Sequence, residues 1–408
     1  MRIRRAACWH GKVNESKAKK SLFVCAGDHS ADNHGGKLIQ KLKEQMPDLE
    51  IWGLGGTAME KAGMQLLYHR EEMTAIGIVE VIRYLPRLAT MQRELLKQVI
   101  ERKPDALLLL DFGGFNVGFA TLVRKKKSNV PIIYFISPQV WGSRPWRMNA
   151  IAKAVNKMLV IFPFEEALYK RKNIEAKFVG HPVTMLFKSE SERRSKVDFC
   201  VQHGLDPRKP IIGIFPGSRK QELAAHAEMV MQAVHWLSRE RPELQFVISS
   251  ASPKMNEQMQ RFYEKPEYIL LYGKTLKSIS CDFNEELMTH SDLLWTKSGT
   301  TTLEATLIGK PMLIFYRGPW ISYLLVLIFK IVKYVGWPNL LHGEGVVPEL
   351  IQLDCRAEQL VRYTCDWLDV PGLRQEISAE LATLRVHLGE GDFTDNALRE
   401  ILAFLKES

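Results

Sequence analysis

The chain has 408 residues, which are too many for one hydrophobic core and predict two or three domains. With 46% hydrophobic and 25% charged residues, its composition excludes an intrinsically disordered protein. The net charge is +10, but the body of the chain has no interleaving of basic and aromatic residues, which argues against nucleic acid as a partner.

The first feature along the chain is a basic segment, residues 1–20. It carries seven lysines and arginines and one acid, so its net charge is +6 and the rest of the chain keeps +4. Because the segment has no apolar core, it is not a secretory signal. We predict a disordered N-terminal extension, with contact to anionic lipid or nucleic acid as the alternative.

Short apolar runs alternate with segments of helical spacing in the first half of the chain. The runs predicted to be strands are SLFVCAG (21–27), EIWGLGG (50–56), DALLLLD (105–111), VPIIYFIS (130–137), KMLVIFPF (157–164) and AKFVGHP (176–182). Continuous apolar strands between helices are typical of a parallel sheet covered on both faces. The polar stretch 184–200 interrupts this pattern, and we interpret it as a linker.

A second alternating series follows the linker. Its predicted strands are PIIGIF (210–215), LQFVISS (244–250), YILLYG (268–273), DLLWTKS (292–298) and PMLIFYR (311–317). The pattern predicts an α/β protein with two doubly wound, Rossmann-like domains, residues 21–184 and 185–349, that face each other across a central cleft. Residues 350–408 have helical spacing and are expected to pack back on the body.

The most apolar stretch is 320–336. Lys330 and Lys333 interrupt it, so it is too short and too charged to span a membrane. Trp320 and Tyr334 near its ends suit a helix at the headgroup boundary. The alternative is a helix buried in the second half of the chain or in a homodimer interface.

Polar and glycine-rich turns follow the predicted strands at the edge where doubly wound sheets bind ligands. In FPGSRKQEL (215–223), Arg219 stands between a strand and a helix, where backbone N–H groups favour an anion. A basic residue in such a turn is more often plain turn chemistry. In SGTTTLE, Ser298, Gly299 and Thr300 offer donors that suit a diphosphate, and Glu304 could accept bonds from a ribose; the alternative is an ordinary helix cap.

Several motifs are absent. The chain has no P-loop, no complete dinucleotide fingerprint and no D-x-D pair to hold a metal on a diphosphate, so we predict no metal and no cofactor. The six cysteines form no C-x-x-C pair, which favours a reducing compartment and argues against structural zinc. Without a metal, cations such as Arg219 and helix N-termini must stabilise a leaving diphosphate.

Two further residues lie at predicted strand ends. Asp111 closes an apolar run, where a partly desolvated carboxylate can act as general base on a substrate hydroxyl. On spacing alone, an Asp that caps the following helix is the more common explanation. His181 in GHP is most simply a turn histidine beside the linker.

From about residue 21 to the C-terminus, the chain resembles the lipid-A-disaccharide synthase family. The motifs that carry the resemblance are AGDHSAD, GLGGTAM, MTAIGIVEV, DFGGFN, SPQVWGSR, FPFE, FVGHPV, PGSRKQE, SGTTTLEA, PMLIFYR and PNLLHGEGVVPELIQ. The resemblance implies a GT-B-type inverting glycosyltransferase. Such an enzyme moves 2,3-diacylglucosamine from UDP to the 6-hydroxyl of 2,3-diacylglucosamine 1-phosphate (lipid X) and forms the β-1,6 disaccharide of lipid A. It also implies a cytoplasmic enzyme, peripheral on the inner membrane of a Gram-negative bacterium.

The resemblance assigns roles to residues. Its essential residues fall on Asp111, Arg219 and Asn339. Substrate contacts are expected in the nucleotide half from Gly217, Ser218, Ser298, Gly299, Thr300 and Glu304, and in the acceptor half from Ser30, Asp32, Gly55, Gly56, Asn116, Ser137 and His181. This chain departs from the family pattern in that Asp28 replaces a Glu, Ala31 a Gly and Gly114 an Asp, which bears on the acceptor rather than on the reaction type.

Two other functions remain as alternatives. One is another UDP-sugar GT-B enzyme, such as a lipid-linked GlcNAc transferase or a UDP-GlcNAc epimerase, which would not predict SPQVWGSR or PNLLHGEG. The other is a non-catalytic nucleotide-sugar-binding or nucleic-acid-binding protein, which only the basic segment supports.

Overall fold

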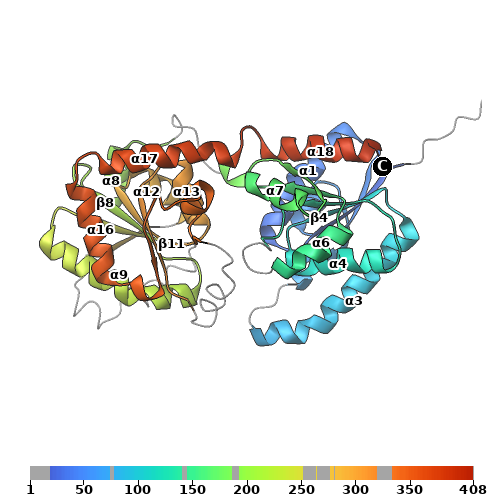
Figure 1. Cartoon of the computed structure of the whole chain (residues 1–408), viewed down its shortest axis with the longest axis horizontal. Helices are drawn as coiled ribbons and strands as arrows, with labels where there is room; N and C mark the ends of the chain where they lie inside the picture. Colours follow the sequence, from blue (N-terminus) through green and yellow to red (C-terminus); the bar gives the residue numbers. More distant parts are fainter. Residues whose placement is uncertain are drawn as a thin grey trace, which may run out of the picture.

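Two α/β halves lie side by side in the computed structural model (Figure 1). The structure describes residues 19–73, 78–139, 145–185, 193–250, 263, 276–279, 281–318 and 333–407. In this part of the chain, a parallel sheet of seven strands has the order β3-β2-β1-β4-β5-β6-β7, and a parallel sheet of six has the order β10-β9-β8-β11-β12-β13. The predicted fold class of two doubly wound domains is confirmed, while the exact domain limits stay predictions.

The first half alternates strands and helices along the chain. Its elements are β1 (Ser21–Ala26), α1 (His29–Gln45), β2 (Glu50–Gly55), α2 (Thr57–Lys61), β3 (Gln65–His69), α3 (Ile78–Arg102), β4 (Ala106–Leu110), α4 (Gly113–Lys125), β5 (Ile132–Phe135), α6 (Met148–Ala154), β6 (Lys157–Val160), α7 (Pro163–Lys170) and β7 (Glu175–Phe178). The central strands are fully buried, as in β4, because helices cover both faces of the sheet. The edge strand β3 was not predicted, since its half-buried residues form no continuous apolar run.

The second half repeats this plan and ends in helices. Its elements are α8 (Lys196–His203), β8 (Ile211–Phe215), α9 (Lys220–Glu240), β9 (Gln245–Ser249), β10 (Leu276–Ile279), α12 (Asn284–His290), β11 (Leu293–Lys297), α13 (Thr300–Leu307), β12 (Met312–Tyr316), α15 (Trp337–His342), β13 (Glu349–Ile351), α16 (Ala357–Asp369), α17 (Leu373–Thr383) and α18 (Phe393–Glu407). The predicted strand at 268–273 lies outside the described residues. The short strand β13 was not predicted, because three residues carry no period.

Each sheet reverses its strand order at one point. In the first sheet β1 lies between β2 and β4, with Ala26 paired to Leu110 at their carboxyl ends. In the second sheet β8 lies between β9 and β11, with Phe215 paired to Thr296. Ligands of open α/β sheets bind in the crevice outside such a switch point. A site is therefore expected in the loops that follow β1, β4, β8 and β11.

The C-terminal helices join the two halves. The chain crosses between them near η7 (Leu384–Leu388): Leu384 packs in the core of the second half and Leu388 in that of the first. Helix α18 then lies against α1, as Figure 1 shows. The halves also meet through Phe162 and Trp337, whose rings stack with centroids 4.3 Å apart.

No helix in the described residues is long and apolar enough to cross a membrane. The predicted interfacial stretch 320–336 and the basic segment 1–20 lie mostly outside the described part of the chain.

Candidate functional site

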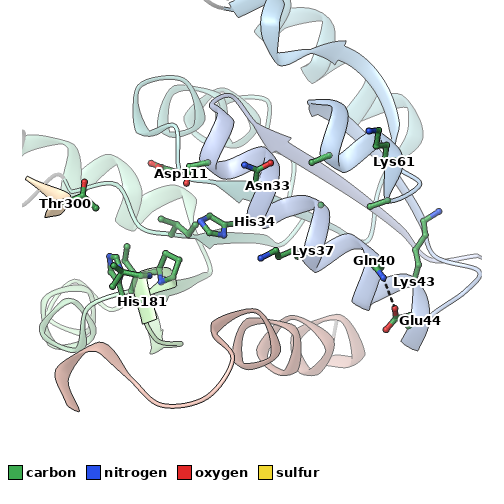
Figure 2. A pocket seen from close by; sticks show the side chains of 18 residues that line it. Asn33, His34, Lys37, Gln40, Lys43, Glu44, Lys61, Asp111, His181 and Thr300 are labelled. Carbon is green, nitrogen blue, oxygen red and sulfur yellow. Dashed lines mark hydrogen bonds between the residues drawn. The ribbon is translucent and has the colours of Figure 1, made fainter. Parts of the chain in front are cut away.

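A cavity of about 1040 Å³ opens at the carboxyl edge of the first sheet (Figure 2). Ser30 lines it from the first turn of α1, and Asp111 and His181 line it from the loops after β4 and β7. Thr300, the first residue of α13, lines it from the second half of the chain. The structure therefore brings together these four predicted site residues, which are far apart in the sequence, at the boundary between the two halves.

The backbone around Asp111 is held in an unusual conformation. Asp111 and Phe112 have φ angles of +41° and +47°, in the left-handed region that non-glycine residues rarely adopt. The carbonyl oxygen of Asp111 accepts bonds from the hydroxyl of Tyr134 at 2.5 Å and from the amide of Asn116 at 3.0 Å. Such backbone strain persists only where surrounding contacts fix it, and it concentrates at functional sites.

The carboxyl group of Asp111 is less acidic than usual. Burial, and after it the negative charge of Asp28, raises its pKa from 3.8 to about 6, although the Phe112 N–H opposes the shift. At neutral pH the group is still mostly ionised, yet it is a stronger proton acceptor than an ordinary carboxylate. It suits a general base. Asp111 does not cap α4, whose N-cap is Phe112.

Several residues predicted to contact the acceptor instead build the loops around the cavity. Asp32 is buried and accepts bonds from the N–H groups of Gly56, Ala58 and Met59 at 2.9–3.2 Å, so its carboxylate caps α2. Gly55, which ends β2, leads into this cap. Neither Asp32 nor Gly56 lines the described cavity, because the carboxylate is already used by the backbone.

The side chains of Asn116 and Ser137 likewise form hydrogen bonds within the chain. The buried amide of Asn116 donates to the carbonyl groups of Cys25 and Leu110 as well as Asp111, so it ties β1 to β4 at the switch point. The hydroxyl of Ser137 donates to Glu165 at 2.6 Å. Both residues position the site rather than face it.

A second cavity of about 240 Å³ lies between the carboxyl ends of β8 and β11. The predicted nucleotide residues gather here: its lining includes Gly217, Ser218, Arg219, Gly299, Thr300 and Glu304. Ser298 is the exception, since its hydroxyl donates to the carbonyl oxygen of Val335 at 2.7 Å and it does not line the cavity. Burial raises the pKa of Glu304, whose side chain faces a confined space.

The loop before α9 differs from expectation in one respect. The N–H groups of Ser218 and Arg219 are not available to bind an anion, because both donate to the carboxylate of Glu222, at 3.2 and 3.3 Å. Gly217 has a φ of +112°, and a Cβ there would lie 2.5 Å from the same carboxylate, so only glycine fits this turn. The guanidinium group of Arg219 lies 3.9 Å from the carboxylate of Glu222, but the side chain is 83% exposed, so a ligand in the second cavity can reach it.

One functional candidate and one positioning residue were missed in the sequence. Lys297, the last residue of β11, lines the second cavity with its ammonium group 3.0 Å from Glu222. The buried ring of His226 accepts a bond from the N–H of Arg317 at 3.0 Å and contacts the carbonyl oxygen of Pro216 at 3.3 Å, so it links the ends of β12 and β8. Lys297 directly precedes the SGTTTLE motif, and this position was the available signal.

Asn339 lies in neither described cavity. It is 1% exposed, and its amide donates to the carbonyl oxygen of Val347 and to Glu349, both at 2.8 Å, while its oxygen accepts from the N–H groups of Val346 and Val347. Glu349 in turn accepts from the backbone that enters α15. In this structure Asn339 holds the loop from α15 to β13 together.

Comparisons with known proteins match this chain to one family over most of its length. The family model described as "Lipid-A-disaccharide synthetase" matches residues 22–370. The chain is 33% identical to the lipid-A-disaccharide synthase of Syntrophotalea carbinolica over 397 residues, which are 97% of this chain and 98% of the relative. It is 31% identical to lipid-A-disaccharide synthase 1 of Legionella pneumophila (strain Philadelphia 1) over 386 residues, 95% of this chain and 98% of the relative.

Solved structures share the fold at low identity. UDP-GlcNAc 2-epimerase from Neisseria meningitidis, bound to UDP-GlcNAc, aligns with a TM-score of 0.60 and 13% identity, over 94% of this chain and 100% of the epimerase. MurG from Acinetobacter baumannii aligns with a TM-score of 0.54 and 13% identity, over 94% of this chain and 99% of that one. These likenesses show the architecture alone.

Proposed function

The chain belongs to the lipid-A-disaccharide synthase family, and we propose that its two cavities carry out the transfer of 2,3-diacylglucosamine from UDP to the 6-hydroxyl of lipid X. The chain is a glycosyltransferase of lipid A biosynthesis. The alternative, another UDP-sugar enzyme of the same architecture, is not favoured, because the matching family model and the relatives at 31% and 33% identity are lipid-A-disaccharide synthases.

One observation carries the assignment: Thr300 lines both cavities. The cavity that holds Asp111 therefore meets the cavity that holds Arg219 and Lys297 at a single residue. A donor in the second half and an acceptor in the first would bring their reacting atoms together at this meeting point.

The chemical step then follows from the groups present. The Asp111 carboxylate accepts the proton of the 6-hydroxyl, whose oxygen attacks C1 of the donor sugar. The bond between C1 and the β-phosphate oxygen breaks, and UDP leaves with the electron pair. The configuration at C1 inverts, which gives the β-1,6 linkage. Tyr134 and Asn116 keep Asp111 in place by bonds to its carbonyl oxygen.

Positive charge near the second cavity would stabilise the leaving diphosphate. Arg219 and Lys297 supply it, and Gly299 and Thr300 at the start of α13 add backbone donors. Glu304, on the first turns of the same helix, would accept bonds from the ribose hydroxyl groups.

Product analysis tests this function. The purified chain is incubated with UDP-2,3-diacylglucosamine, lipid X or both, in excess EDTA and in Mg²⁺. We expect UDP and a disaccharide 1-phosphate only when both substrates are present, at equal rates in EDTA and Mg²⁺. UDP release from the donor alone, or an epimerised donor, would contradict the function. A rate that EDTA abolishes and Mg²⁺ restores would contradict the metal-free mechanism.

We further propose that the enzyme works on the cytoplasmic surface of the inner membrane, because both substrates carry acyl chains. The support is the composition of residues 320–336 and the basic segment 1–20. Flotation with anionic vesicles tests the idea on the full chain, on a chain that lacks residues 1–20, and on Leu324→Glu/Leu327→Glu. Equal flotation of all three, or none, would exclude both segments as anchors. Association of the stretch in a homodimer is the competing proposal, and sedimentation of the Glu variant would reveal it.

A further inference from the structure

We propose that the wall of the first cavity formed by α1 and α2 binds the phosphate group of the acceptor, with Lys37 as the direct ligand and with Lys43 and Lys61 as flanking charges. The inference rests on the proposed function, since the acceptor is the phosphorylated substrate of that reaction. It adds the residues that recognise the anionic end of the acceptor, for which the strand-end motifs offered no candidate.

The three lysines line the same cavity as Asp111. Figure 2 shows Asp111 and Thr300 toward one end, Lys43 and Lys61 toward the other, and Lys37 between them. Lys37 and Lys43 belong to α1, and Lys61 ends α2. The cavity thus runs from the proposed general base to a positively charged end.

The spacing on α1 places Lys37 near the chemistry. Ser30, Asn33, Lys37 and Gln40 recur at intervals of three or four residues, so they share the helix face that lines the cavity. At about 1.5 Å of rise per residue, Lys37 lies roughly 10 Å along the helix from Ser30, and Lys43 roughly 20 Å. The 6-hydroxyl and 1-phosphate of the acceptor stand at opposite ends of one sugar ring, so Lys37 is the lysine within reach of the phosphate.

The lysines on this wall are not neutralised by the chain. Among the described residues, none of the three forms an ion pair with a carboxylate. Glu44 is the carboxylate that lines the same stretch, and it accepts a hydrogen bond from Gln40 at 3.3 Å. Lys41 gives the contrast, because it does not line the cavity and pairs with Asp392 and Asp395.

Neighbouring groups agree with this placement. Lys37 and His34 both line the cavity, and the charge of Lys37 joins burial in lowering the pKa of His34, although Asp28 opposes the shift. The amine of Lys43 lies against the turn after α2, where a Cβ on Gly63 would be 3.1 Å from its Nζ atom. The apolar part of the lining comes from Ile136, Ile161, Pro182 and Val183, which follow β5, β6 and β7. A cavity lined by both lysines and apolar side chains suits an amphiphilic anion.

The test compares lipid X with the same lipid lacking its phosphate, in the full chain. For the wild type we expect kcat/KM to fall about tenfold or more when the phosphate is removed, as for a charge-assisted contact. Lys37→Gln should lower kcat/KM for lipid X by a similar factor, leave the dephosphorylated acceptor unaffected and leave the KM of the donor unchanged. The ratio of kcat/KM for lipid X to kcat/KM for the dephosphorylated lipid then falls toward one, and Lys37→Arg restores most of this ratio.

The flanking lysines provide a graded prediction. Lys43→Gln and Lys61→Gln should weaken the phosphate preference less than Lys37→Gln does, and their effects should vanish in high salt, because charges beyond about 8 Å are screened at physiological ionic strength. Lys125→Gln is the matched control, since Lys125 is an exposed lysine of α4 outside the cavity.

The outcomes separate the proposals. An unchanged preference for phosphate in Lys37→Gln overturns the inference, and so does a wild type that uses both acceptors equally well. Loss of binding to anionic vesicles with an unchanged preference would assign the lysines to a lipid surface, which also overturns it. If the wild type makes no disaccharide from lipid X, the proposed function itself has failed.

Discussion

The ammonium group of Lys297 lies 3.0 Å from the carboxylate of Glu222, at the point where the two central strands of the second sheet end. The same carboxylate accepts the N–H groups of Ser218 and Arg219. Although burial alone would raise its pKa, the bonds from Lys297 and the two N–H groups lower it, so Glu222 stays ionised. One partly buried acid therefore fixes both the Arg219 loop and the lysine that faces the cavity.

Lys297→Met should weaken UDP binding. Because a charge-assisted bond to phosphate is worth about 1.5–3 kcal/mol, we expect the Kd for UDP to rise by roughly tenfold or more. Calorimetric titration with UDP measures this. Lys220→Met, a lysine in the first turn of α9 that does not line the cavity, is the control. Equal UDP affinity in Lys297→Met and wild type would exclude Lys297 from the diphosphate site.

Asp111→Asn should lower turnover by a factor of roughly 10² or more, since a general base contributes about 10²–10⁴. The amide keeps the shape of the carboxyl group but does not accept a proton, so UDP binding should change little. In the wild type, the rate should fall as the pH drops below about 6, where Asp111 becomes protonated. A folded Asp111→Asn variant with near-normal turnover would disprove the role.

The same substitution should stabilise the fold at neutral pH. Since the pKa of Asp111 is raised from 3.8 to about 6 in the folded chain, protonation favours folding. This contribution is fully present below pH 3.8 and is lost as the pH rises through about 6. At pH 7, Asp111→Asn should therefore raise the free energy of unfolding by about 1–3 kcal/mol, and near pH 3.5 it should have little effect. Urea titrations at the two pH values check this prediction, and a gain of equal size at both would contradict the raised pKa of Asp111.

Arg219→Ala should weaken UDP and donor binding by about 10–150-fold and slow turnover. Arg219→Lys should recover only part, because a lysine does not bind phosphate in a bidentate way. The side chain is 83% exposed, so neither variant should lose stability. Calorimetry that finds the same UDP affinity in Arg219→Ala and wild type would show that the diphosphate lies elsewhere.

Asn339→Ala should act through stability. The variant leaves the N–H groups of Val346 and Val347 without their acceptor, and we expect the free energy of unfolding to fall by about 2–3 kcal/mol. Turnover per folded molecule should stay within about tenfold of wild type, unlike that of Asp111→Asn. Thermal melting and active-site-normalised rates measure the two effects. An unchanged melting temperature together with lost turnover would instead make Asn339 catalytic, as the family resemblance implies.

The sequence alone determined the architecture and the two loops that matter most. Continuous apolar runs such as ALLLL in β4 report a strand buried on both faces, because only a covered parallel sheet removes both faces from water. Asp111 and Arg219 could be singled out because Asp111 directly follows such a run and Arg219 stands in the short loop after another, so both lie at the carboxyl edge of a sheet. The end of a strand can be predicted from the sequence because it depends on the neighbouring residues alone.

Only the tertiary structure decided which polar side chains face a cavity. Asp32, Asn116 and Asn339 sit in motifs that look like binding loops, yet their side chains satisfy backbone groups from other segments. Lys297 joined the site only because β8 and β11 are neighbours, and Lys37 because α1 turns one face toward the cavity. A buried donor or acceptor must find a partner, and that partner is set by strand order and helix rotation, which bring distant parts of the chain together and leave no local trace.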